Sequence, residues 1–130
     1  MKRKKLQPIS KLKRILWSLC REITAKRYSD VCFTCGRKVE GSNRQLGHCI
    51  PSSIGGALLR YHLDNLRWQC YNCNINCGGN GALYALNLTK EIGVKRIGEM
   101  VLLKRKITKA DRYFYETKIA EYTEILASLQ

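Results

Sequence analysis

Acidic residues, histidine, proline and long apolar runs are all scarce in this chain of 130 residues. No run approaches the roughly 18 consecutive apolar residues of a membrane-spanning helix, so we expect no integral membrane protein. The basic N-terminus leads into no uninterrupted apolar stretch with a small-residue cleavage site, so we expect no secretory signal and a cytoplasmic location. The apolar fraction of 45% and the charged fraction of 26% are typical of a globular protein rather than a disordered one.

The shortage of acidic residues leaves a large excess of positive charge. Against 24 Lys and Arg stand 10 Asp and Glu, which gives a formal net charge of +14. Such a charge predicts a polyanionic partner, with nucleic acid as the first candidate and plain solubility as the alternative. Seven of the first fourteen residues are basic and none is acidic. The residues that we expect to contact nucleic acid are Lys2, Arg3, Lys4, Lys5, Lys11, Lys13, Arg14 and Arg21.

Cysteine is abundant, with seven residues in a chain for which we expect a reducing compartment. That setting favours metal ligands or buried thiols over disulfides. Four of the seven form two CxxC pairs, Cys32-Phe-Thr-Cys35 and Cys70-Tyr-Asn-Cys73. Two such pairs complete a closed, tetrahedral Cys₄ site, so we predict one structural zinc per chain.

Other interpretations of the cysteines remain open at this stage. A redox CxxC needs a βαβ setting that the sequence lacks, whereas a [4Fe–4S] cluster also takes four cysteines. Cys77 is an alternative ligand in place of Cys73, and Cys20 is expected to be a small core residue.

Hydrophobic periodicity predicts an amphipathic helix after the basic N-terminus, with Ser10 as its N-cap. On another face of this helix, Trp17 lies with Lys13 and Arg21. Trp17 either flanks the core or belongs to a basic, aromatic surface that faces DNA. The apolar stripe consists of Leu12, Ile15, Leu16, Leu19, Cys20 and Ile23.

Residues 30–80 lack helical periodicity. We therefore predict turns and short strands in this segment, with Gly55-Gly56 as a hairpin turn. We predict helices from Gly81 to Gly93 and from about Val94 to Arg105. A last helix is expected to begin at Thr108, where Thr-Lys-Ala-Asp fits a capping box. Its apolar positions predict packing on the same chain or, alternatively, a homodimer seam. These positions are Tyr115, Ile119, Tyr122, Leu126 and Leu129.

Thirty-four residues separate Cys35 from Cys70, more than the roughly 15–20 of a simple four-cysteine zinc ribbon. The motifs in and after this insert are, in order, Gln45-Leu-Gly-His48, Ile50-Pro51, Gly55-Gly56, Asn65-Leu66 and Cys70-x-x-Cys73-Asn74. This order resembles the HNH (ββα-metal) nuclease motif. Together with Trp17, Leu59-Arg60-Tyr61 and Gly79-Asn80, it is similar to the phage NinG (Rap) recombination nuclease family over roughly residues 12–93.

The resemblance implies an α+β fold with a zinc-stapled ββα-metal (HNH) core, a basic N-terminal helix and a helical C-terminal tail. Within one compact domain, we expect a basic arm and amphipathic helix over residues 1–29. The nuclease core with its Cys₄ site would follow over 30–93, and the tail over 94–130.

The resemblance also implies a metal-dependent DNA endonuclease. It would hydrolyse phosphodiester bonds in branched recombination intermediates such as Holliday junctions, flaps and D-loops, in the host cytoplasm if phage-encoded. His48 would be the general base, a role that suits an imidazole with an ordinary pKa near 6.5. Asn65 would brace the loop that carries the histidine. Arg60 either clamps the scissile phosphate or simply forms part of the basic surface.

Asn74 would bind the catalytic Mg²⁺ or Mn²⁺, for which an amide oxygen is a suitably hard ligand. Because Asn74 directly follows the last zinc cysteine, we expect the zinc site to hold it against His48. Gly47 departs from the pattern of many HNH enzymes, which have an aspartate there as a second metal ligand. Two alternatives therefore stay open: a non-catalytic zinc module that binds nucleic acid through its charge, and an HNH nuclease of phage packaging or restriction.

Overall fold

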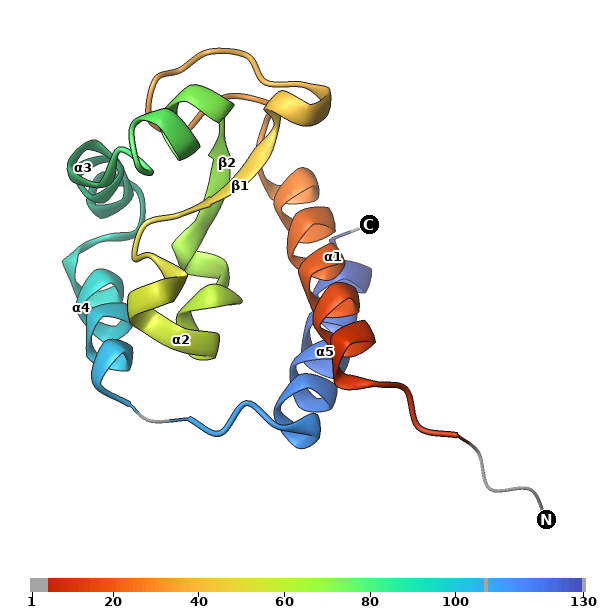
Figure 1. Ribbon diagram of the computed structural model, residues 1–130. Helices are drawn as coiled ribbons and strands as arrows, with labels where there is room; N and C mark the ends of the chain where they lie inside the picture. Colours follow the sequence, from red (N-terminus) through yellow and green to blue (C-terminus); the bar gives the residue numbers. More distant parts are fainter. Residues whose placement is uncertain (1–4, 107, 130) are drawn as a thin grey trace.

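The computed structural model describes residues 5–106 and 108–129. Figure 1 shows a pair of strands in the middle, with α1 and α5 on one side and α3 and α4 on the other. The helices and strands are α1 (Ile9–Arg27), β1 (Gln45–His48), α2 (Ser52–Arg60), β2 (Leu66–Gln69), α3 (Gly81–Ile92), α4 (Val94–Leu102) and α5 (Arg112–Ser128). The short turns between them are η1 (Gly41–Asn43), η2 (Leu63–Asn65), η3 (Asn72–Asn76) and η4 (Leu103–Arg105). The predicted α+β class is confirmed.

The apolar stripe predicted near the N-terminus forms the buried face of α1. Leu16 and Cys20 have no exposed surface and pack in a core cluster that includes Tyr115 and Tyr122 of α5. The hydroxyl of Tyr122 donates a hydrogen bond to the carbonyl oxygen of Tyr61 at 2.5 Å, which ties α5 to the segment after α2. The apolar face of α5 therefore packs on the same chain, the first of the two predicted alternatives. A homodimer through this helix stays a prediction.

Both long helices begin at residues other than those predicted. The N-cap of α1 is Pro8, whose extended backbone precedes a first turn that contains Ser10. Proline suits this place because the first amides of a helix have no partner within the helix. The N-cap of α5 is Asp111, whose carboxylate accepts a hydrogen bond from the Phe114 amide at 3.1 Å. The predicted capping box at Thr108 is therefore wrong. Asp111, the fourth residue of that motif, is itself the N-cap, and its charged oxygen binds the helix amide.

The two strands pair antiparallel, with Gln45 opposite Gln69 and His48 opposite Leu66. Side chains alternate between the two faces of such a pair. Leu46 and its partner Trp68 belong to the core cluster that contains α1. Gly47 faces the other way, toward the side chain of Gln69, and its carbonyl oxygen accepts a hydrogen bond from Tyr84 of α3 at 2.9 Å. The strand pair thus separates an α1 side from an α3 side.

The connection between the strands contains a helix, α2, where the sequence predicted turns and strands. Gly55 and Gly56 lie inside α2 rather than in a hairpin turn, and Gly56 kinks the helix with φ 65° and ψ −163°. The helix forms because its Leu59 is fully buried in a second core cluster with Tyr84, Leu88 and Met100. Two adjacent glycines have low helix propensity, so the local sequence did not predict this helix. Its stability comes from tertiary packing.

The predicted helices at the start of the C-terminal part are confirmed as α3 and α4. Gly93 ends α3 with φ 89°, a left-handed conformation that glycine adopts without steric cost. Leu88 of α3 and Met100 of α4 are buried in the second cluster, which lies on the α3 side of the strand pair. Within residues 5–106 and 108–129, no helix is both long and apolar enough to cross a membrane.

A side chain at Gly47 would disrupt the strand pair. A Cβ atom built there would collide with the amide of Gln69, which is fully buried. We expect Gly47→Ala to lower the free energy of unfolding by about 1–3 kcal/mol, the usual cost of overpacking a core. Gly98→Ala is the matched control, because nothing lies within 4 Å of a Cβ at Gly98 in α4. Urea unfolding of the two variants measures both effects, and equal stabilities would contradict the predicted collision.

Candidate zinc cluster and basic cleft

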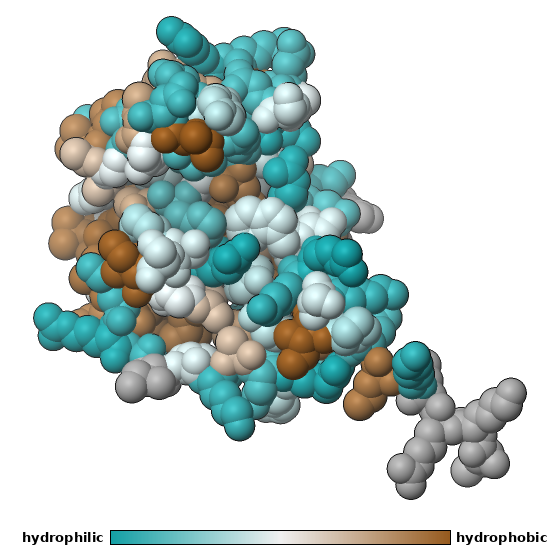
Figure 2. All heavy atoms as spheres, in the orientation of Figure 1, coloured by the Kyte–Doolittle hydropathy of each residue, from teal (hydrophilic) through white to brown (hydrophobic). Residues whose placement is uncertain are grey.

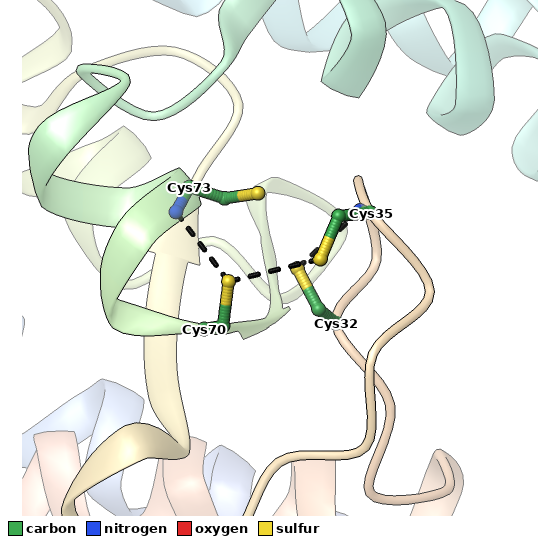
Figure 3. Close-up of side chains that lie close together, drawn as sticks. All are labelled: Cys32, Cys35, Cys70 and Cys73. Atoms are coloured by element: carbon green, nitrogen blue, oxygen red, sulfur yellow. Dashed lines mark hydrogen bonds between the residues drawn. The ribbon is translucent and has the colours of Figure 1, made fainter.

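The four cysteines of the two CxxC pairs come together, as predicted. Figure 3 shows their sulfur atoms converging from the loop after α1 and from the end of β2. The four sulfurs all lie within 4.8 Å of one another, and the Sγ atoms of Cys35 and Cys70 are 3.7 Å apart. Zn–S bonds of about 2.3 Å in a tetrahedron place sulfurs about 3.8 Å apart, so the residues fit one zinc ion. In a [4Fe–4S] cluster each thiolate binds a different iron, so the sulfurs lie further apart.

Backbone amides support the sulfurs of both pairs. The amide of Cys35 donates to the Sγ of Cys32 at 3.5 Å, and the amide of Cys73 donates to the Sγ of Cys70 at 3.4 Å. Burial opposes ionisation of the Cys32 thiol, but hydrogen bonds from Thr34 and from backbone amides outweigh it and lower the pKa to about 6. Desolvation and the neighbouring thiols raise the pKa of Cys35 to about 12, so the first thiolate of the pair forms at Cys32. A low pKa favours the thiolate, which is the form that binds metal.

The remaining cysteines lie outside this cluster. Cys77 is exposed, and its sulfur accepts a weak hydrogen bond from Asn72. The fourth cysteine of the cluster is therefore Cys73 and not the alternative Cys77. Cys20 is buried in the core as predicted, and burial raises the pKa of its thiol to about 12. Cys49 packs against the second core cluster, and nothing in the structure gives it a chemical role.

His48 is the last residue of β1, and its ring is held from two directions. The Nε2 atom lies 2.9 Å from the carbonyl oxygen of Arg60, and the ring stacks on Trp17 of α1 with centroids 5.7 Å apart. Because a carbonyl oxygen only accepts, Nε2 carries the hydrogen and the neutral ring keeps its lone pair on Nδ1. Burial lowers the pKa of His48 below its ordinary 6.5, and the nearby charge of Arg60 lowers it further.

Asn65 holds the segment that follows His48. Its Oδ1 accepts a hydrogen bond from the Ile50 amide at 2.7 Å, and its Nδ2 donates to the carbonyl oxygens of Ile50 and Leu59, each at 2.9 Å. Asn65 itself has no exposed surface. The side chain therefore joins the residues after β1 to the end of α2, the two segments between which His48 is fixed. This geometry agrees with the bracing role that the resemblance implied.

Asn74 has a hydrogen-bond partner at the start of β1. Its Nδ2 donates to the Oε1 of Gln45 at 2.9 Å, so Asn74 contacts the start of β1 whereas His48 ends that strand. Among the hydrogen bonds of the described residues, none joins Asn74 to His48. The placement of Asn74 against His48 therefore stays a prediction. No local pattern in the sequence indicates Gln45 as the partner.

A basic, aromatic hollow opens beside His48; we call it the Trp17 hollow. Its volume is about 350 Å³, within the usual range of ligand sites. The residues that line it are Lys13, Arg14, Trp17, Ser18, Arg21, Arg60 and Tyr61. Three of the predicted nucleic-acid contacts therefore lie together with Arg60. Tyr61, the remaining ring of the hollow, was missed because it lies far from α1 in sequence and only the fold brings it close.

The other predicted nucleic-acid contacts are more scattered. Lys2, Arg3 and Lys4 lie outside the described residues. Lys5 and Lys11 are exposed, and Lys5 lines a separate groove of about 440 Å³ between the N-terminal segment and α5. In Figure 2, hydrophilic residues predominate on the α1 side of the molecule, whereas hydrophobic residues gather largely on the α3 and α4 side.

The fold and the cluster together define a small α+β protein with four cysteines placed to bind a structural zinc ion. The chain belongs to the NinG family, because the family model described as Bacteriophage Lambda NinG protein matches residues 1–130. Comparison with curated proteins and with solved structures gives no match. The family resemblance stated from the sequence motifs is therefore confirmed at the level of NinG.

Proposed function

We propose that this NinG protein is a metal-dependent DNA endonuclease that cuts branched recombination intermediates. The observation that carries the proposal is the setting of His48: an imidazole with a lowered pKa, fixed by Arg60 and Trp17, next to a basic hollow. The order of two antiparallel strands followed by helical structure also agrees with the HNH motif that the sequence resembles. Selectivity for branched DNA rests on the resemblance.

In this proposal the chain itself supplies the base and the phosphate contacts. His48 accepts a proton from the attacking water at Nδ1, while Nε2 keeps its hydrogen bond to the Arg60 carbonyl oxygen and so holds the ring in place. The exposed guanidinium of Arg60 contacts a phosphate oxygen, and Lys13 and Arg14 on the same hollow hold the neighbouring backbone.

A divalent ion would stabilise the charge on the phosphate and on the leaving oxygen. Within the described residues, the four cysteines are the one group of three or more His, Cys, Asp or Glu side chains able to hold a metal. Asn74 has its Nδ2 engaged with Gln45, which leaves Oδ1 as the amide oxygen available to Mg²⁺ or Mn²⁺. With so few protein oxygens, the ion would take its remaining ligands from phosphate and water, as Mg²⁺ commonly does.

A cleavage assay tests the proposal directly. Labelled duplex, flap and four-way-junction DNA would be incubated with the protein in Mg²⁺, in Mn²⁺ and without added divalent ion. We expect cutting of the flap and the junction in either metal and none without it. Binding to all three DNAs without cutting under any condition would overturn the nuclease and favour a zinc module that only binds nucleic acid.

The pH dependence of cutting should follow the ionisation of His48. The base must be neutral, and its pKa lies below the ordinary 6.5 because burial disfavours the charged ring. We therefore expect kcat/KM to rise with pH, with a midpoint below 6.5, and to be level by about pH 7.5, because kcat/KM reports the free enzyme. Rates measured from about pH 5 to about pH 8 check this, and a midpoint above 6.5 would contradict it.

A further inference from the structure

The Trp17 hollow gathers four cations on one surface. Lys13, Arg14, Arg21 and Arg60 all line it, and within the described residues no salt bridge involves any of them. Elsewhere in the same residues five cations pair with a carboxylate, but most of the other Lys and Arg side chains also form no salt bridge, so it is the clustering of these four that distinguishes the hollow. Clustered charges of one sign repel each other, and a bound anion removes that repulsion. This surface is therefore suited to a phosphate-bearing ligand.

The hollow also has an aromatic surface held rigidly in place. Trp17 projects from α1, stacks on the ring of His48 with an angle of 20° between planes, and meets Tyr61 edge-on with centroids 6.2 Å apart. Tyr61 is in turn buried against Tyr115 of α5. The indole is half-buried, so part of it contacts these neighbours while part lines the hollow.

We propose that the Trp17 hollow binds one unpaired nucleotide of the DNA, with its base against the indole of Trp17 and its phosphate against Arg60 and Lys13. A base within a duplex is already stacked on both faces, so it has no free face to offer. An unpaired base, as in a single-stranded flap, presents a free face to an aromatic side chain. This inference rests on the proposed function in one respect, that DNA is the substrate, and it makes Trp17 a residue that selects branched DNA.

The location of the hollow links this selection to the chemistry. Arg60 contributes its carbonyl oxygen to the hydrogen bond with His48, while its guanidinium lies 5.9 Å from the ring centroid of Trp17 and 5.8 Å from that of Tyr61. Trp17 itself stacks on His48. A nucleotide bound in the hollow would therefore bring the phosphate beside the branch point next to the imidazole.

The test measures binding rather than cutting, without added divalent ion, by fluorescence anisotropy of a duplex and of the same duplex with a short single-stranded flap. We expect the wild-type protein to prefer the flap, and Trp17→Leu to bind it about 5- to 100-fold more weakly, the usual loss for one stacked base. Affinity for the plain duplex should change less than about 2-fold, because phosphate contacts supply it. Tyr113→Leu is the matched control, an aromatic residue on α5 that is 77% exposed.

Equal loss on both DNAs, or no loss on either, would overturn the inference. Because Trp17→Leu could lower stability, a second measurement uses the wild-type protein and a flap with 2-aminopurine at its first unpaired position. Stacking on the indole should quench the emission on binding, whereas unchanged or increased emission would refute the stacked base. If the protein prefers the flap but never cuts DNA, the nucleotide-binding inference stands and the proposed nuclease activity is refuted. If it cuts DNA but shows no preference for the flap, only the inference is refuted.

Discussion

His48→Ala is expected to abolish DNA cutting while leaving zinc content and DNA affinity close to those of the wild-type protein. A general base contributes about 10²–10⁴-fold in rate but little to ground-state binding, so the loss should appear in kcat. The ring is half-buried between Trp17 and Arg60, whereas the pairing of His48 with Leu66 uses only backbone atoms, so we expect the strand pair and the cysteine cluster to stay intact. Single-turnover cutting of a labelled flap, with protein in excess, measures the chemical step directly.

His62→Ala is the matched control, because His62 is the second of the two histidines. Its Nδ1 accepts a hydrogen bond from the Asp64 amide, and it lines a different pocket, beside α5. We expect this variant to cut at the wild-type rate. Full cleavage by His48→Ala, in a preparation free of contaminating nuclease, would refute the proposed mechanism and leave nucleic-acid binding as the better explanation of the charge.

The parts of the structure that depend on short spacing could be predicted from the sequence. A CxxC pair specifies its own turn, so the spacing of the cysteines alone identified the four ligands that the fold brings together. The stripe on α1 and the glycine that ends α3 are likewise local signals, one of periodicity and one of backbone conformation. Each of these needs only residues within a few positions of one another.

The parts that the sequence could not predict depend on contacts between distant segments. Asn74 adjoins the zinc cysteines in sequence, whereas its hydrogen-bond partner is Gln45, 29 positions away. Similarly, the Trp17 hollow joins α1 to the end of α2, a helix that two glycines concealed. The place of Trp17 on a basic face of α1 could be predicted from the sequence, whereas its contacts with Tyr61 and His48 could not.

The largest effect on stability is expected from Cys70→Ser, which should unfold the protein. In small metal sites the free energy of zinc binding is also free energy of folding, about 10–16 kcal/mol in zinc-finger peptides. A domain of this size is stable by only about 5–15 kcal/mol, so losing one thiolate removes most or all of that margin. Cys70 directly follows β2, and its sulfur lies 3.7 Å from that of Cys35, so the cluster joins the strand to the loop after α1.

Metal analysis and thermal unfolding by circular dichroism check this prediction, with about one zinc expected per wild-type chain. Cys77→Ser makes the same chemical change at an exposed cysteine outside the cluster, so its zinc content and melting temperature should match those of the wild-type protein. A chelator should unfold both the wild-type protein and Cys77→Ser, because both depend on the same ion. If Cys70→Ser instead melted like the wild-type protein, the cluster would be dispensable for folding. The core around Leu16, Trp68 and Tyr122 would then have to stabilise the fold alone.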